Sequence, residues 1–192
     1  MYKWYNKHSL LCLMIFCYII PILYVCFYYQ SNHSVSNIIC NVNYKTCILC
    51  FMILMGLFTI LYEVERNDFV SILSISILLG CIYGLIIFDE SYNLHYIFAV
   101  VVFVMILLFN IRHCYLHNCD TILLLSLGVS VGLLGYMIYY IKDNIFLSEV
   151  IYILNFAFVY LYIHFVDFGK HMDINRELDT EIDTEMNKNK IT

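Results

Sequence analysis

The chain has 192 residues, of which 62% are hydrophobic and 13% charged, and its formal net charge is −5. This composition excludes an ordinary water-soluble domain, in which about a quarter of the residues are charged. It also excludes nucleic acid as a partner, because the chain lacks the clusters of Lys and Arg that neutralise phosphates.

Six long apolar stretches account for most of the chain, and each is close to the ~20 residues that a helix needs to cross a bilayer. Whole segments contain no charged residue, whereas a helix in water would carry charges on one face. The stretches are too long for the strands of a membrane β-barrel and do not alternate apolar with polar residues. The sequence therefore predicts an all-α fold, a polytopic membrane helix bundle with six transmembrane helices at residues 10–29, 44–62, 69–88, 95–111, 121–140 and 146–165.

The N-terminal stretch follows two lysines, Lys3 and Lys7, as in a signal peptide or a signal anchor. It is longer than the apolar core of a signal peptide and has no small-residue cleavage site, so we expect it to remain as the first helix. Asn32 then begins an N-glycosylation sequon. Its closeness to the end of the first helix argues against a glycan.

The distribution of Lys and Arg predicts the orientation in the membrane. With six helices, eight of the ten positive residues fall on the side that holds both termini. The positive-inside rule then predicts that both termini are cytosolic. The expected domains are a six-helix transmembrane domain at 1–168 and a polar, acidic tail at 169–192, which we expect to be disordered or to bind a protein partner.

The connector after the fourth stretch contains four soft metal ligands within seven residues, namely His113, Cys114, His117 and Cys119. Such residues can bind Zn²⁺, but a single short connector leaves little room for a tetrahedral site. We expect no metal and no cofactor here. The favoured interpretation is a cap at the membrane interface, with Cys114 and Cys119 as candidate palmitoylation sites.

The fifth stretch carries small residues at helical spacing, Gly128, Gly132 and Gly135. Glycines spaced in this way let two helix backbones approach closely in lipid. We expect this face to pack inside the bundle, and a dimer interface is the alternative.

Four ionisable residues lie at the non-cytosolic ends of the predicted helices. Asp89 and Glu90 follow the third and are expected to be solvated loop charges, while His95 starts the fourth and Glu149 lies near the start of the sixth. A carboxylate at that depth needs a partner or a wet cavity, and His95 is the best partner on the same side. The simpler interpretation is that Glu149 interacts favourably with the N-terminus of its own helix. The alternative is that His95, Glu149 and Asn155 line a polar site that binds a lipid head group or a sterol hydroxyl.

The segment His95-Tyr-Ile-Phe-Ala99 and the last stretch, from Glu149 to Asp167-Phe168, resemble the Frag1/DRAM/Sfk1 family of six-helix membrane proteins. In that family a histidine opens helix 4, an acidic residue opens helix 6, and an Asp-Phe pair lies where helix 6 reaches the cytosol. The resemblance covers helices 3 to 6 in pattern and the first two in topology. It implies a non-catalytic, lipid-associated or regulatory role in membrane lipid organisation or autophagy.

Two other classes of function stay open. A membrane-embedded zinc-dependent lipid hydrolase would use His113 and His117, with His164 and His171 approaching them from the last helix. A small transporter would need a polar path at mid-membrane depth, where the spans offer only a few serines and Asn155. The expected partners are membrane lipids, and the expected location is the endomembrane system, the lysosome or the plasma membrane.

Overall fold

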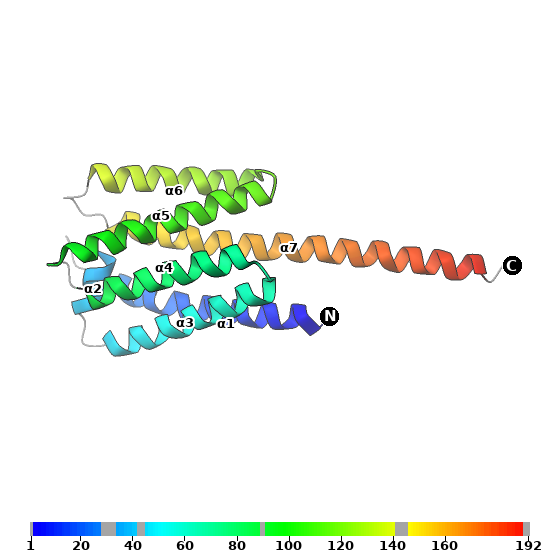
Figure 1. Ribbon diagram of the computed structural model, residues 1–192, viewed down its shortest axis with the longest axis horizontal. Coiled ribbons are helices and arrows are strands. Elements are labelled where there is room, and N and C mark those ends of the chain that lie inside the picture. Colours follow the sequence, from blue (N-terminus) through cyan, green and yellow to red (C-terminus); the bar gives the residue numbers. More distant parts are fainter. Residues whose placement is uncertain (1, 28–33, 42–44, 89–90, 141–145, 190–192) are drawn as a thin grey trace. The chain divides into compact units, whose positions relative to one another are not determined.

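The computed structural model describes residues 2–27, 34–41, 45–88, 91–140 and 146–189, and these residues form seven helices and no strand (Figure 1). Six of these helices are long and apolar enough to cross a bilayer. The prediction of an all-α fold with six such helices is confirmed, and it fits an integral, multi-pass membrane protein. The helices are α1 (Tyr2–Phe27), α2 (Val35–Asn41), α3 (Lys45–Arg66), α4 (Phe69–Ile87), α5 (Asn93–Leu116), α6 (Thr121–Tyr139) and α7 (Phe146–Asn189).

The chain divides into two compact units, Met1–Ala157 and Phe158–Thr192. The first unit contains α1 to α6 and the first turns of α7. The second contains the rest of α7, which remains helical to Asn189. Residues 169–189 are thus helical, whereas the sequence predicted disorder. They contain no proline and a single glycine, Gly169, so the backbone has no strong helix breaker after the last apolar stretch has started the helix.

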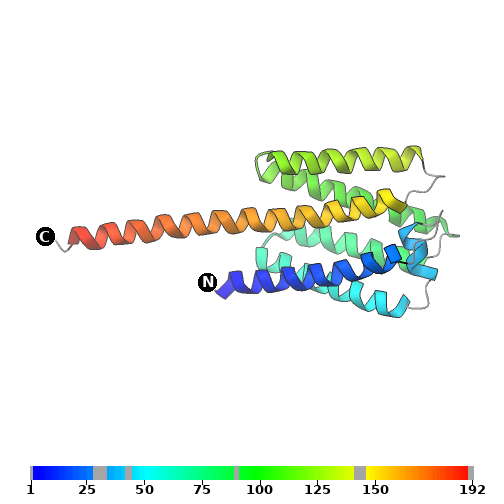
Figure 2. The same cartoon turned by 180° about the vertical axis from the view of Figure 1, so that it is seen from behind.

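In the first unit, consecutive long helices lie side by side in antiparallel pairs (Figures 1 and 2). α3 packs against α4, α4 against α5, and α5 against α6, while α1 packs against α3. Aspartates start two of the helices: Asp68 accepts a hydrogen bond from the backbone N–H of Ser71, and Asp120 accepts one from that of Ile122. Each side chain satisfies an N–H group that has no partner within its helix.

Polar and apolar residues are distributed as a lipid environment requires. Large apolar side chains such as Phe16, Leu125 and Ile138 are more than half exposed. The buried positions include polar residues, among them Ser71, Ser126, Ser130, Asn110 and His113. Because lipid solvates apolar groups and cannot satisfy polar ones, this distribution agrees with six membrane spans.

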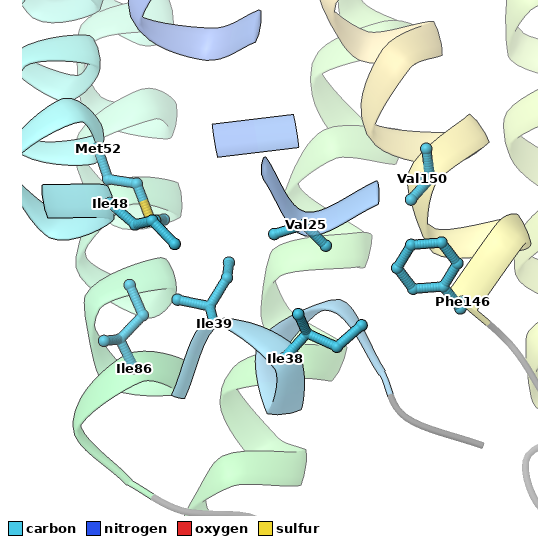
Figure 3. Close-up of a cluster of buried hydrophobic side chains, with 8 residues drawn as sticks. All are labelled: Val25, Ile38, Ile39, Ile48, Met52, Ile86, Phe146 and Val150. Atoms are coloured by element: carbon cyan, nitrogen blue, oxygen red, sulfur yellow. The ribbon is translucent and has the colours of Figure 1, made fainter. Parts of the chain in front are cut away.

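The first unit has two ends, which are named here by their contents. The hairpin end holds the turns that join α3 to α4 and α5 to α6, whereas the α2 end holds the short helix α2. Figure 3 shows that α2 places Ile38 and Ile39 against apolar side chains of four other helices. The cluster consists of Val25, Ile38, Ile39, Ile48, Met52, Ile86, Phe146 and Val150.

Gly84 is a position of tight packing between α4 and α5. A Cβ atom on this residue would lie 2.7 Å from atoms of the Phe98 ring. That ring is also stacked on Phe88, with ring centroids 5.7 Å apart. The absence of a side chain at Gly84 therefore allows Phe98 to pack against the end of α4.

We expect Gly84→Ala to destabilise the protein, because the added methyl group displaces the Phe98 ring and overpacking costs about 1–3 kcal/mol. The thermal unfolding midpoint of the detergent-solubilised protein measures this effect. Gly80→Ala is the matched control, since a Cβ at Gly80, one turn earlier on α4, meets nothing within 4 Å. Equal midpoints for the two variants would contradict this account of Gly84.

Candidate functional site

His95 is buried in the first turn of α5, where it connects three helices. Its Nδ1 lies 2.8 Å from the carbonyl oxygen of Phe88, at the end of α4. A carbonyl can only accept, so Nδ1 carries a proton. Nε2 lies 3.1 Å from the hydroxyl oxygen of Ser36 in α2, and in the neutral imidazole it accepts the hydroxyl proton. His95 therefore joins the end of α4 and the start of α5 to α2.

Glu149 is buried in the first turn of α7 and holds the first residue of α2. Its Oε2 accepts a hydrogen bond from the backbone N–H of Val35 at 2.7 Å. This distance is typical of a charge-assisted hydrogen bond, which is stronger than a bond between neutral groups. The same turn of α2 is capped by Ser34, whose hydroxyl oxygen accepts from the N–H of Asn37 at 3.1 Å.

His95 and Glu149 thus reach adjacent residues of one short helix. The hydroxyl groups of Ser34 and Ser36 lie 3.0 Å apart and complete the polar cluster. We call these five residues, Ser34, Val35, Ser36, His95 and Glu149, the α2 latch. The two serines are half-buried.

The sequence patterns did not predict the α2 helix, although two features of the sequence are consistent with it. Ser34 precedes the helix as an N-cap residue, and the pair Ile38-Ile39 supplies an apolar face. With seven residues α2 is shorter than the windows in which helical periodicity can be recognised. Its position therefore depended on contacts that the sequence does not reveal.

Asn155 does not belong to the latch. Its Oδ1 accepts from the hydroxyl of Ser126 at 2.8 Å, and its Nδ2 donates to the hydroxyl oxygen of Ser130 at 2.9 Å. Asn110 Nδ2 also donates to Ser130, at 3.0 Å. The prediction that grouped Asn155 with His95 and Glu149 is corrected, because six residues of helix place it about 9 Å further along α7.

The three glycines of α6 are also placed differently from the prediction. Gly128, Gly132 and Gly135 are exposed, and no described residue comes within 4 Å of a Cβ built on any of them. The buried face of α6 instead carries Ser126 and Ser130, whose hydroxyls need partners inside the bundle. The prediction that this glycine face packs inside the bundle was wrong.

The hairpin end contains an ion pair that sequence reasoning did not find. Arg112 of α5 binds Asp68, the N-cap of α4, through two hydrogen bonds of 2.7 and 2.8 Å. Burial favours the neutral carboxyl, but hydrogen bonds from Arg112 and Ser71 outweigh it and lower the pKa of Asp68 to about 2. Arg112 also donates to the Ser71 hydroxyl oxygen at 2.8 Å. The sequence signal was an acidic residue between two apolar stretches, with an arginine at the same predicted membrane surface.

The four residues considered as metal ligands are not gathered around one point. His113 is buried with Nε2 3.4 Å from the Ser71 hydroxyl oxygen, and its ring stacks against that of His117. Cys114 is buried, whereas Cys119 is exposed. Within the described part of the chain, no three His, Cys, Asp or Glu side chains are arranged to hold a metal ion.

In comparisons with known proteins, no protein-family model, curated protein or solved structure matches this chain.

We expect Asp68→Asn to lower the free energy of unfolding near pH 7 by about 1.5–3 kcal/mol, the contribution of a hydrogen bond to a charged group. The pKa of the Asp68 carboxyl lies at about 2 in the folded protein and near 3.8 in the unfolded chain. Its contribution is therefore complete above pH 4 and is lost as the pH falls towards 2. The difference in unfolding midpoint between wild type and variant should shrink over that range.

Glu65→Gln is the control for this comparison, because the structure shows no hydrogen bond or ion pair for Glu65 among the described residues. It should leave the midpoint near that of the wild type at every pH. An Asp68→Asn effect that stays constant from pH 7 to pH 3 would show that the carboxylate charge is unimportant.

Proposed function

We propose that this chain is a non-catalytic, lipid-associated membrane protein that binds a hydroxyl-bearing lipid at the α2 latch. The observation that carries the proposal is that two buried ionisable residues, His95 and Glu149, hold adjacent residues of one short helix. Ionisable side chains within membrane spans are costly, so they commonly mark functional sites. Here they lie at the start of α5 and of α7, the depth at which lipid head groups meet the hydrocarbon.

The chemistry of the latch favours a hydroxyl group as the ligand. Glu149 accepts hydrogen bonds, and the hydroxyls of Ser34 and Ser36 both donate and accept. These serines are half-buried, and beneath them lies the apolar cluster that contains Ile38 and Val150. A sterol, or a lipid with a hydroxylated head group, offers a hydroxyl to the serines and an apolar body to the surrounding helices.

Binding is favoured over catalysis because both ionisable groups are already engaged. His95 hydrogen-bonds the backbone of α4 and the Ser36 hydroxyl, and Glu149 binds the backbone of α2. A general acid or base must be able to exchange its proton with a substrate. The expected role is therefore that of the Frag1/DRAM/Sfk1 type, a regulator of membrane lipid organisation with both termini in the cytosol.

The test is to quantify lipids that co-purify with the wild type, Glu149→Gln and Glu149→Ala. Glutamine keeps an oxygen that can accept from the Val35 N–H, whereas alanine removes it. We expect the amount of bound hydroxyl-bearing lipid per protein to fall several-fold in the alanine variant and less in the glutamine variant. Mass spectrometry of the extracted lipids identifies the class, a sterol or a lipid with a hydroxylated head group.

Glu65→Ala is the matched control, since it removes a carboxylate from α3 outside the latch. It should retain wild-type lipid content. His95→Gln tests the other half of the latch and should also reduce bound lipid. If monodisperse Glu149→Ala and His95→Gln proteins both keep the wild-type amount of lipid, the latch is a structural support and the proposal fails.

A further inference from the structure

The C-terminus of α5 ends in a tight cap that brings two residues five positions apart back together. The backbone N–H of Cys119 donates to the carbonyl oxygen of Cys114 at 2.8 Å, and that of Asn118 donates to Tyr115 at 3.2 Å. These bonds span six and four residues, the pattern of a Schellman motif. Asn118 and Cys119 both have positive φ, 54° and 55°, which reverses the chain direction.

The cap places the two thiol groups next to each other. In a Schellman motif the residues joined by the longer hydrogen bond commonly make a side-chain contact. Here these residues are Cys114 and Cys119, whose side chains lie close enough to interact. A cysteine with positive φ is uncommon, because its Cβ lies close to the following carbonyl. The folded cap therefore holds Cys119 in a restricted position against Cys114.

The two cysteines differ in access. Cys119 is exposed at the hairpin end, whereas Cys114 is buried beneath it. An oxidant from the aqueous phase therefore meets Cys119 first, with a second thiol already in contact. This arrangement of an accessible thiol and an adjacent resolving thiol is typical of cysteines that are oxidised reversibly.

We propose that Cys114 and Cys119 are a modification site at which a peroxide forms a reversible intrachain disulfide. The thiolate of Cys119 attacks one peroxide oxygen and breaks the O–O bond, which gives a sulfenic acid and, for hydrogen peroxide, hydroxide. The Cys114 thiol then attacks the Cys119 sulfur and displaces hydroxide, which takes up the thiol proton and leaves as water. In total, two thiols and one hydrogen peroxide yield one disulfide and two water molecules, and a dithiol reductant reverses the change by exchange.

The disulfide would link the last turn of α5 to the start of α6, beside the Arg112–Asp68 ion pair of the hairpin end. Cys114 follows Arg112 and His113 on α5, and Cys119 precedes Asp120, the N-cap of α6. Such a short loop restricts the unfolded chain less than a long one, so the effect on global stability is small. The disulfide would instead restrict the short connection between these two helices.

The test exposes the detergent-solubilised full chain to hydrogen peroxide and then alkylates it without prior reduction. After proteolysis, mass spectrometry should find a peptide that has lost two hydrogen atoms and carries no alkyl group on Cys114 or Cys119. Treatment with dithiothreitol before alkylation should restore two alkylated cysteines. Oxidation of Cys119 to sulfinic acid with Cys114 still alkylated would overturn the proposal.

Cys47 and Cys50 form the matched control pair, because both are exposed on α3 and lie three residues apart. They should remain alkylated at both positions under the same conditions. In a Cys114→Ser variant, Cys119 should accumulate as a sulfenic acid that dimedone labels. If the control pair is oxidised as fast as the cap pair, the cap geometry has no special role and the proposal is rejected.

Discussion

The hydrogen-bonding demand of groups that lipid cannot satisfy determines how this bundle is assembled. In the hydrocarbon region an unpaired polar group costs several kcal/mol, so each polar side chain of the spans needs a partner, either in its own helix, as for Thr59 and Ser76, or in another. Three groups of polar contacts between helices are examples. The α2 latch joins α2 to α5 and α7, the Asn155 network joins α5, α6 and α7, and Arg112 joins α5 to α4. Apolar packing fills the space between these groups of contacts.

This constraint explains which parts of the fold the sequence could predict. The six spans were predicted because their length and lack of charge are properties of a single segment. The rotation of each span was not, since a helix that is apolar all round does not reveal which face turns inwards. On α6 both the serines and the glycines have helical spacing. Ser126 and Ser130 face inwards because their hydroxyls need partners, whereas Gly128 and Gly132 have no side chain that requires one.

The candidate site was only partly predictable for the same reason. His95 and Glu149 were selected because both are ionisable and lie at the same predicted depth, and the structure brings both to α2. Their actual partners, the Val35 N–H and the Ser36 hydroxyl, lie in a helix too short for sequence patterns to reveal. The Arg112–Asp68 pair was missed because its partners are 44 positions apart and each is a common residue at a helix end. The depth of a residue in the membrane can be predicted from one sequence. Which of several polar residues at the same depth will pair with one another cannot.

The short helix α2 links the polar latch to the apolar core of the α2 end. A helix of seven residues is not stable alone, because its few hydrogen bonds barely offset the conformational entropy lost in forming the first turn. Glu149 satisfies one of its free N–H groups, Ser34 satisfies another, and Ile38 and Ile39 are buried beneath. The helical state of α2 therefore depends on side chains supplied by α5 and α7. A lipid hydroxyl that bonds Ser34 or Ser36 would act on the cap of this same helix. The proposed binding at the latch would therefore act on the same turn of backbone that Glu149 and Ser34 cap.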